Sequence, residues 1–447
     1  MVNRYNFLMH KIDVAGLKID TLPKSELIDK LKNRIALNQQ TWVTTVYSEF
    51  LYAALKDPRV MTMLNQADIA VPDGIGIFWA HKFLNLPLTA KSYLGKILQS
   101  LWQIKLTLLK LLFKKRDFET IPGSELIWDI AKMAEENNFS IYLLGGFGNT
   151  PKLVSNILIT KYPGLRIAGF SGKNPEDPTI YEDIKKASPD ILFVAYGPIK
   201  QEAWIQANLK NLPVKLAIGL GGTFDYIAKK RLNPPKFVRK MGLEWLFRLI
   251  TQPYRLRRIF NATFGLIAML MRYKIFNSYP LRQNVAVVIL NKENKVLIGE
   301  RSPKDFYIDL INSEERLKQK NYWQLPQGGI DKGEETTAAA KREAFEETGI
   351  KNLDLIKISD KTNIYYWNNA LRKLFKNRNH KNCGQKQTIV YLKFLGSDTE
   401  IHMDQKEFIG FKWASIQELN SQVHPERETL AKIVQNDLKE MLEKAII

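Results

Sequence analysis

Residues 328–350 read GGIDKGEETTAAAKREAFEETGI, and this stretch decides the fold of the C-terminal part of the chain. The pattern is G-x5-E-x7-R-E-U-x-E-E-x-G-U, where U is an aliphatic residue. Thr336 or Thr337 can cap a helix that alanines fill and Gly349 ends. So many specified positions are not typical of an ordinary solvated acidic helix face. The specified positions are Gly328, Glu334, Arg342, Glu343, Ala344, Glu346, Glu347, Gly349 and Ile350.

Three carboxylates share one face of this predicted helix, because Glu343, Glu346 and Glu347 stand at positions i, i+3 and i+4. Crowded carboxylates repel one another unless a cation neutralises them, and Mg²⁺ or Mn²⁺ suits oxygen ligands and a phosphate substrate. Such an ion bridges phosphate oxygens and activates a water molecule. We therefore predict a metal site at the three glutamates, with Glu346 and Glu347 also catalytic. Arg342 can orient the glutamates or bind phosphate.

The motif resembles the box of Nudix hydrolases, which implies an α/β/α-sandwich fold. Residues 323–330 (WQLPQGGI), 384–387 (GQKQ) and 407–413 (EFIGFKW) resemble RNA pyrophosphohydrolases and dinucleoside polyphosphate hydrolases in particular. The resemblance covers nearly all of residues 280–440. It implies that Glu407 is a further metal ligand or base, and that Arg282 and Lys386 bind phosphate.

Two segments depart from that subgroup, since 305–321 and 368–381 are long and charged. We expect them to border the substrate. The sequence therefore predicts Mg²⁺-dependent hydrolysis of a nucleoside or RNA 5′-diphosphate-linked compound. It leaves an RNA 5′ end, a dinucleoside polyphosphate and a nucleotide-sugar open as substrates.

The first part of the chain alternates apolar runs with helical patterns. The runs end in glycine turns at 140–146, 190–197 and 215–222, with helical patterns at 123–138 and 200–209. Buried parallel strands with crossover helices give this pattern, so we predict a Rossmann-like open parallel sheet with ligands at the carboxyl ends of its strands. The pattern breaks at Asn277-Ser278-Tyr279-Pro280, and we predict domains at 1–277 and 278–447.

Asp73 is the candidate base of the first domain. It lies in residues 71–77, VPDGIGI, at a predicted strand end, although Asp-Gly is also a common turn. Downstream, the glycines of residues 145–148 (GGFG) follow a strand as phosphate loops do, and GPIKQE (197–202), GLGGTFD (219–225), GLEWLFRL (242–249) and PYRLRR (253–258) follow in order.

This ordered set resembles the WecG/TagA/CpsF glycosyltransferase family over residues 10–275. The resemblance implies transfer of N-acetylmannosamine or a related sugar from a UDP-sugar to undecaprenyl-diphosphate-linked N-acetylglucosamine. It implies that Asp73 deprotonates the acceptor hydroxyl. Residues 1–280 contain no Asp-x-Asp, which is consistent with a transfer that needs no metal. The predicted substrate-binding residues are Thr45, Gly145, Gly146, Lys200, Gln201, Glu202, Arg248, Arg255 and Arg258.

Several positions depart from the family pattern. Tyr47 stands where an asparagine is expected, Thr120 replaces an arginine, Ile199 replaces a proline, and Asn233-Pro234-Pro235 replaces Arg-Ala-Pro. These changes motivate an alternative, in which the first domain binds sugar nucleotides or tethers the hydrolase to a membrane without turnover.

The chain of 447 residues has a net charge of +20 and one cysteine, which favours phosphate-bearing partners and a reducing cytoplasm. We find no signal peptide, and no apolar run long enough to predict a transmembrane span. Residues 91–117 are predicted as a basic amphipathic insertion that reaches an anionic membrane, with packing on the domain core as the alternative. We therefore expect a cytoplasmic enzyme, peripheral on the inner face of the plasma membrane. The basic loops could also bind RNA.

Overall fold

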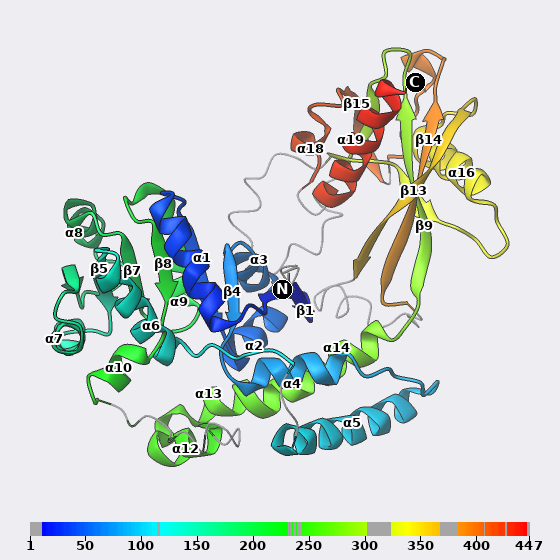
Figure 1. Cartoon of the computed structure of the whole chain (residues 1–447). Helices are drawn as coiled ribbons and strands as arrows, with labels where there is room; N and C mark the ends of the chain where they lie inside the picture. Colours follow the sequence, from blue (N-terminus) through cyan, green and yellow to red (C-terminus); the bar gives the residue numbers. More distant parts are fainter. Residues whose placement is uncertain are drawn as a thin grey trace, which may run out of the picture. The chain divides into compact units, whose positions relative to one another are not determined.

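The computed structural model describes residues 11–113, 117–230, 232, 235, 238, 244–301, 323–366, 382–405, 407–424 and 427–444. The chain divides into two compact units, Met1–Ile275 and Phe276–Ile447 (Figure 1).

The first unit is built on a six-stranded parallel sheet of order β4-β3-β8-β7-β5-β6. Nearly every residue of the five strands other than β6 is buried, as expected for parallel strands covered on both faces. The predicted open parallel sheet is confirmed. The strands are β3 (Thr41–Val46), β4 (Ile69–Pro72), β5 (Ser140–Gly145), β6 (Arg166–Ser171), β7 (Ile191–Ala195) and β8 (Leu216–Gly219).

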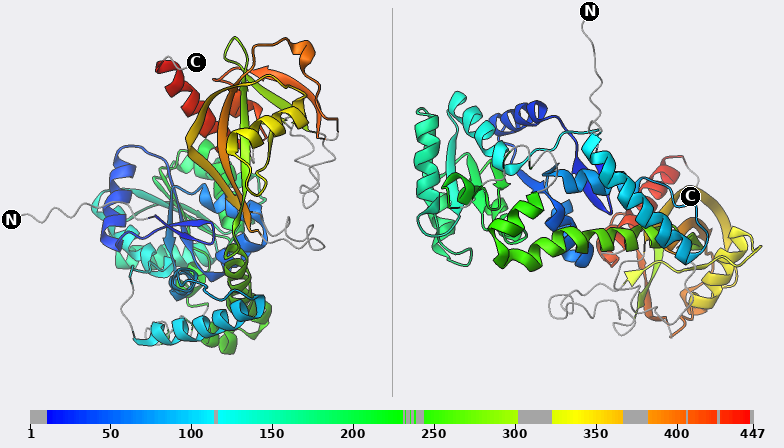
Figure 2. Two further views of the ribbon diagram at one scale, coloured as in Figure 1. Left: turned by 90° about the vertical axis from the view of Figure 1, so that its right-hand side faces the viewer. Right: turned by 90° about the horizontal axis from the view of Figure 1, so that it is seen from below.

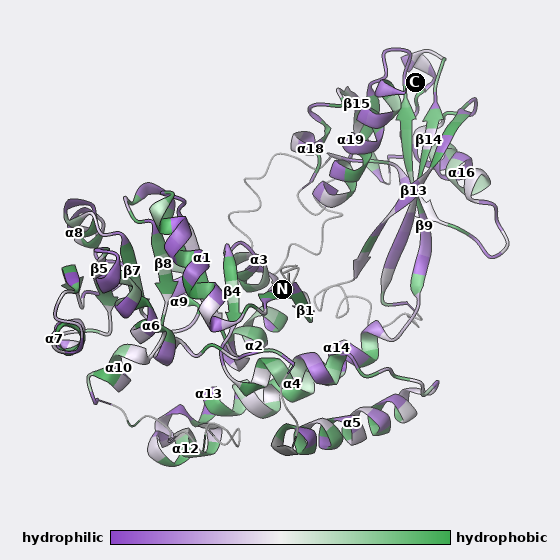
Figure 3. Ribbon diagram, in the orientation of Figure 1, coloured by the Kyte–Doolittle hydropathy of each residue, from purple (hydrophilic) through white to green (hydrophobic). Residues whose placement is uncertain are grey.

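Helices cover both faces of this sheet (Figures 1 and 2). Strand alternation divides the core: Val43 and Leu143 pack with α1 and α6, whereas Trp42 and Leu144 pack with α2, α4 and α9. Figure 3 shows the apolar character of the central strands. The helices are α1 (Lys24–Ala36), α2 (Ser48–Lys56), α3 (Pro58–Asn65), α4 (Ile75–Leu84), α5 (Tyr93–Phe113), α6 (Gly123–Glu136), α7 (Thr150–Lys161), α8 (Thr179–Ala187), α9 (Lys200–Asn208), α10 (Thr223–Ile227) and α12 (Glu244–Thr251).

Two smaller features complete the first unit. A hairpin of β1 (Lys11–Val14) and β2 (Leu17–Asp20) precedes α1. At the other end, the short helix η2 (Pro253–Arg255), α13 (Leu256–Phe260), a π-helical turn (Asn261–Gly265) and α14 (Leu266–Asn277) follow one another without a break. This run, Pro253–Asn277, is long and apolar enough to cross a membrane by length and composition alone, with 28% of its most apolar window buried.

The second unit has a mixed sheet of order β11-β10-β9-β14-β13, with β12 paired to β9 and β15 to β10. The elements are β9 (Leu281–Leu290), β10 (Val296–Arg301), β11 (Trp323–Gln324), β12 (Gln327–Gly329), α16 (Thr336–Thr348), β13 (Asp354–Tyr366), β14 (Gly384–Lys393), β15 (Phe408–Ala414), α18 (Leu419–Gln422) and α19 (Glu428–Glu443).

Residues of β9 show how this sheet forms the middle layer. Val285 and Val287 pack with α16, whereas Ala286 and Val288 pack with α18 and α19. The predicted α/β/α sandwich is confirmed. The long segments 305–321 and 368–381 lie outside the described residues, so their predicted contact with substrate stays a prediction.

Candidate active sites

Helix α16 carries the glutamates of the second unit, and its two ends are fixed differently. Glu335 is the N-cap and makes no side-chain cap, so the predicted threonine cap does not form. Gly349 ends the helix in the left-handed conformation at φ 73°. The amides of His402 and Asp404 donate to the Thr348 and Glu347 carbonyls at 2.8 and 3.0 Å. These two bonds hold the segment leading to Glu407 against the end of α16.

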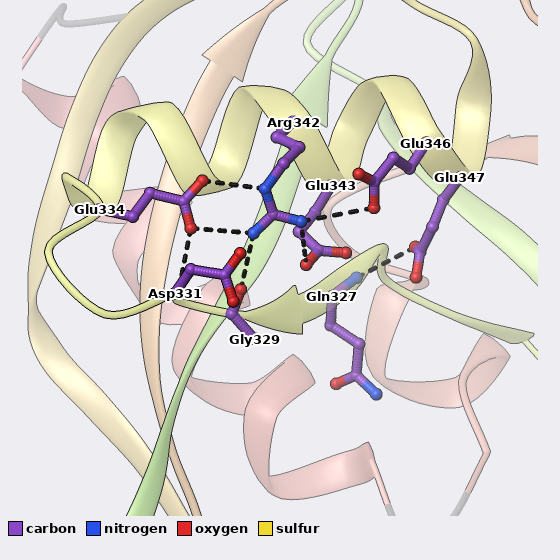
Figure 4. A network of polar contacts seen from close by, with 8 residues as sticks. All are labelled: Gln327, Gly329, Asp331, Glu334, Arg342, Glu343, Glu346 and Glu347. Carbon is purple, nitrogen blue, oxygen red and sulfur yellow. Dashed lines mark hydrogen bonds and ion pairs between the residues drawn. The ribbon is translucent and has the colours of Figure 1, made fainter.

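Arg342 is the centre of an ion-pair network (Figure 4). Its Nε and Nη2 donate to the two Glu334 carboxylate oxygens at 2.8 and 2.9 Å, and Nη2 also donates to the Gly329 carbonyl at 2.8 Å. Hydrogen bonds from Arg342 lower the pKa of Glu334 to about 2. Glu334 and Gly329, which precede α16 in the chain, thus fix the guanidinium of Arg342, which extends from α16 itself.

The other nitrogen of Arg342 reaches the predicted metal ligands. Nη1 donates to Glu343 Oε1 at 2.8 Å and to Glu346 Oε2 at 3.3 Å. Gly328 lies beneath Glu343, and a Cβ there would stand 1.8 Å from the Glu343 carboxyl carbon. Only glycine at position 328 leaves room for this carboxylate in its present position.

Glu347 is 5% exposed and accepts a hydrogen bond from the Gln327 amide at 3.1 Å. Burial, with the nearby negative charge of Glu407, raises the pKa of Glu347 to about 9. Burial also raises the pKa of Glu343, against the influence of Arg342. The structure therefore brings Glu343, Glu347 and Glu407 into electrostatic contact, while Glu346 remains about half exposed.

These carboxylates suit a hard divalent cation in their chemistry. Glu347 and Glu407 crowd each other, and a cation would relieve the repulsion that raises the pKa of Glu347. In the part of the chain that the structure describes, no group of three acidic, histidine or cysteine side chains forms a metal cluster. Arg342, which pairs with Glu343 and Glu346, neutralises the remainder of the set.

Arg282 and Lys386 do not come together. β14 and β9 are paired in parallel, with Gln387 opposite Asn284, and the Gln387 side chain donates to the Asn284 side chain at 3.1 Å. Odd-numbered residues of β14 therefore lie on the same face of the sheet as even-numbered residues of β9. Arg282 shares that face with Asn284, and its guanidinium lies across Gly329. Lys386, one residue before Gln387, lies on the opposite face, the face of α16. Phosphate binding by Arg282 and by Lys386 stays a prediction.

The first unit has a cleft of ≈ 340 Å³ beyond the carboxyl ends of β5, β6 and β7. This is where an open α/β sheet binds ligands, because the chain leaves β5 and β7 in opposite directions. Lys200 and Arg258, two predicted substrate-binding residues, line it. The other lining residues are Glu49, Phe147, Asn174, Pro175, Glu176, Tyr196, Gly197 and Pro198.

Asp73 follows β4, as predicted. Its amide donates to the Val46 carbonyl at 2.7 Å, and its Oδ2 accepts from the Gly123 amide, in the first turn of α6, at 3.2 Å. The positive end of the α6 dipole therefore stabilises the Asp73 carboxylate. Asp73 is half-buried and does not line the cleft described above.

Thr45, Gln201 and Glu202 are buried, at 3%, 1% and 0% exposure. Thr45 donates to the Gly219 carbonyl at 3.1 Å, and Gln201 accepts from the Gly221 amide at 2.8 Å. Glu202 accepts from the Trp42 indole at 2.8 Å, and burial raises the pKa of Glu202 to about 7. In this structure the three side chains hold the ends of β3 and β8, and their contact with substrate stays a prediction.

Gly145 and Gly146 begin a loop with four successive positive φ angles, through Phe147 and Gly148. A Cβ on Gly145 would stand 2.8 Å from the Ala195 carbonyl, so this turn requires glycine. Phe147 is held in the left-handed region at φ 49° and lines the cleft.

Ile199 is also at positive φ, 68°, where a β-branched residue is strained. The Lys200 amide donates to the Pro198 carbonyl at 2.9 Å, which closes a γ-turn around Ile199. This turn places Lys200 at the cleft, and strain of this kind is often found at functional sites.

Arg258 is the arginine that reaches the cleft. Its Nε pairs with Glu49 Oε1 at 2.5 Å, and its Nη2 donates to the Tyr47 hydroxyl at 3.4 Å. Arg255 donates to Gln252 at 2.8 Å and does not line the cleft, and the side chain of Arg248 lies outside the described residues. Of the two predicted arginines whose side chains the structure describes, it brings Arg258 to the cleft.

Sequence reasoning missed Glu49, Phe147 and Tyr196 as cleft residues. Phe147 lies in the GGFG motif (145–148), and Glu49 follows Tyr47 by two residues. Both residues therefore lie beside positions for which the sequence predicted a function. Tyr196 directly precedes Gly197 at a strand end, the position where such folds place ligand contacts.

Comparison with known proteins finds two families along the chain. The family model described as "Glycosyl transferase WecG/TagA/CpsF family" matches residues 12–106 and 102–279, and the "NUDIX domain" model matches 280–436. The chain therefore belongs to the WecG/TagA/CpsF glycosyltransferase family and carries a Nudix domain after it. Nudix domains generally use a divalent metal, typically Mg²⁺.

Among individual relatives, an N-acetylglucosaminyldiphosphoundecaprenol N-acetyl-beta-D-mannosaminyltransferase of Staphylococcus aureus is 26% identical over 253 residues, which is 56% of this chain and 88% of the relative. Solved structures similar to this chain include the MutT protein of Methanosarcina mazei (15% identity, TM-score 0.23, 36% of this chain and 96% of that one). A C. elegans Ap4A hydrolase is similar as well (19% identity, TM-score 0.24, 36% and 99%).

Proposed function

We propose that the chain is a bifunctional enzyme. Its first domain, 1–277, transfers N-acetylmannosamine or a related sugar from a UDP-sugar to undecaprenyl-diphosphate-linked N-acetylglucosamine. Its second domain, 278–447, hydrolyses a nucleoside or RNA 5′-diphosphate-linked compound with Mg²⁺. Membership of the two families and the activity in the name of the staphylococcal relative support the proposal. The lipid acceptor implies work at the inner face of the plasma membrane.

The position of Asp73 carries the transferase assignment. A carboxylate held by the Gly123 amide and the α6 dipole has a fixed position, as a base that removes a proton from an acceptor hydroxyl must have. Lys200 and Arg258 supply positive charge at the nearby cleft for the diphosphate of the donor.

The test is UDP release by the full chain from UDP-N-acetylmannosamine with a lipid-linked N-acetylglucosamine acceptor. Asp73→Asn keeps the oxygen that accepts from Gly123 and removes the base, so the rate should fall by about 10²-fold or more. Asp183→Asn, an exposed carboxylate paired with Lys173, is the matched control and should transfer normally. Transfer by Asp73→Asn at the control rate would exclude Asp73 as the base.

The crowding of Glu347 and Glu407 carries the hydrolase assignment. Bound Mg²⁺ would supply charge for the phosphate oxygens and an activated water. Glu343, Glu346, Glu347 and Glu407 would hold it, and Arg342 keeps Glu343 and Glu346 oriented toward it. Mg²⁺-dependent hydrolysis, followed by the nucleotide or pyrophosphate products of each substrate, should be lost in Glu347→Gln and Glu346→Gln. The substrate panel contains RNA 5′-triphosphate, dinucleoside polyphosphates and UDP-sugars, and normal hydrolysis by both variants would refute the assignment.

One contact favours an alternative for the first domain. Arg258, proposed to hold diphosphate, is paired with Glu49 and Tyr47, and Tyr47 replaces the asparagine of the family pattern. The domain would then bind a sugar nucleotide or tether the hydrolase without turnover. Failure with every UDP-sugar, together with measurable UDP binding, would support this alternative. Tyr47→Asn should then restore transfer if the tyrosine is what blocks the site.

A further inference from the structure

Helix α5 is packed with its polar side inward. Lys96, Ser100, Gln103 and Thr107 recur at spacings of four, three and four residues, and all four are less than 8% exposed. This spacing defines one face of an α-helix. A helix at the surface of a soluble domain normally turns its apolar face to the core, so α5 has the reverse arrangement.

Specific hydrogen bonds hold this polar face to the domain. Thr107 accepts from the Trp79 indole of α4 at 2.9 Å, and Gln103 donates to the Pro87 carbonyl at 2.8 Å. Lys274 of α14 donates to Gln103 Oε1 at 2.6 Å and also to the Phe83 carbonyl. These contacts tie α5 to two other helices and fix which of its faces points outward.

The outward face is apolar except for Lys105, which is exposed between Leu101 and Leu108. Leu94, Leu98 and Trp102 are 65%, 59% and 62% exposed, and Leu101, Leu108 and Leu109 are exposed beside them. Six large apolar side chains on one face are more than scattered surface residues, and such a patch marks an interaction site.

The charge of the segment identifies the partner. Residues 91–116 contain seven lysines and arginines and no acid, and Lys105 and Lys110 are exposed with the apolar face. A second copy seated on this face would bring only like charges together. An anionic bilayer offers both an apolar interior and opposite charge, which is the environment of helices that lie in the membrane interface.

We propose that α5 is a membrane-docking helix, whose outer face of Leu94, Leu98, Leu101, Trp102, Leu108 and Leu109 enters an anionic lipid surface while its polar inner face holds the transferase domain against it.

The docking helix is also connected to the catalytic turn. After α5 the chain packs Phe118 against Phe78 of α4, with ring centroids 5.2 Å apart, and Asp117 pairs with Lys82. The Ile121 amide then donates to the Pro72 carbonyl at 2.8 Å, next to Asp73. Docking through α5 therefore places the Asp73 turn near the lipid surface. This consequence rests on the proposed transfer to a lipid-linked acceptor, whereas the docking itself does not.

The test is cosedimentation of the full chain with vesicles that lack any acceptor. One set contains phosphatidylglycerol with phosphatidylethanolamine, and the other contains phosphatidylcholine alone. The wild type should bind the anionic vesicles, and Leu98→Glu/Trp102→Glu should bind at least about tenfold more weakly, because two apolar side chains no longer enter lipid. Leu37→Glu, at an exposed leucine (67%) that follows α1, is the matched control and should bind as the wild type does.

Equal binding by the wild type and the α5 variant would overturn the proposal, and so would absence of wild-type binding to anionic vesicles. If the wild type is a dimer that does not bind vesicles, and the α5 variant is a monomer, the apolar face belongs to an interface with a second copy instead. Circular dichroism and the thermal unfolding transition of the first unit show whether the variant is folded. Vesicle binding without any sugar transfer would leave the docking intact and count against the proposed transferase function alone.

Discussion

At the scale of single residues, the burial of Glu202 predicts how the stability of the first unit depends on pH. Glu202 is fully buried among Trp42 and Gln201, and burial raises its pKa from an ordinary value of 4.5 to about 7. The folded state therefore binds more protons than the unfolded state between these values. The contribution of Glu202 to the free energy of unfolding is therefore fully present below pH 4.5. It falls by on the order of 3 kcal/mol as the pH rises to 7.

Glu202→Gln should remove this component, because its side chain stays uncharged at every pH and can still accept from Trp42. Urea unfolding followed by tryptophan fluorescence at pH 5, 6, 7 and 8 measures it. We expect the wild type to lose stability relative to the variant across this window. A constant difference between the two proteins would show that the carboxyl does not titrate there.

The position of Glu347 predicts that Mg²⁺ raises the melting temperature of the second unit. A ligand that binds only the folded state at one hundred times its dissociation constant stabilises that state by about 2.7 kcal/mol. For a unit of this size, Mg²⁺ should therefore raise the melting temperature by about 5 °C or more. Glu347→Gln removes a carboxylate from the crowded set and should abolish most of the shift. Glu335→Gln, an exposed glutamate at the start of α16, should keep it. Equal shifts in all three proteins would place the metal elsewhere.

At the scale of elements, the end of α16 depends on Gly349. Its φ of 73° disfavours any other L-residue, and a Cβ there would approach the His402 carbonyl oxygen at 3.1 Å. Gly349→Ala should therefore destabilise the second domain by about 2 kcal/mol. Gly333→Ala is the matched control, since Gly333 has a similar φ of 84° but open space around it. It should cost about 1 kcal/mol. Identical losses in urea unfolding would show that the His402 contact contributes nothing.

The elements also show what the sequence could predict. Local sequence patterns were enough to predict structure that depends on residues close together in the sequence. Helix α16 is an example, because its glutamates at i, i+3 and i+4 do share a face. Such patterns were also enough for the parallel strands, which are continuous apolar runs. The contact of Arg258 with Glu49 and Tyr47 joins residues about two hundred positions apart, and no local pattern encodes it.

Helix α5 illustrates the same limit. Its periodicity predicted an amphipathic helix, but periodicity alone does not say which face is buried. That choice comes from Trp79, Pro87 and Lys274, which supply polar partners for the inner face. Gln201 and Glu202 show the limit at the site, because their motif indicated function while their burial depends on the distant Trp42 and Gly221.

At the scale of the whole molecule, the two sites belong to separate compact units, each with its own sheet and its own core. Separate cores predict separate unfolding, because each unit buries its own apolar residues. We expect two transitions in calorimetry of the full chain. Mg²⁺ should raise the temperature of one transition, and UDP should raise that of the other.

Point variants in the full chain then assign each transition and each activity. Asp73→Asn should leave Mg²⁺-dependent hydrolysis within about twofold of the wild type, because uncoupled sites differ by less than about 0.4 kcal/mol, whereas a tenfold effect needs about 1.4 kcal/mol. Glu347→Gln should likewise leave UDP release unchanged while the Mg²⁺-sensitive transition loses its shift. If either variant instead depresses both activities by tenfold or more while both transitions persist, the sites are energetically coupled. The fusion would then serve communication between transfer and hydrolysis, and the two domains could not be treated as independent enzymes on one chain.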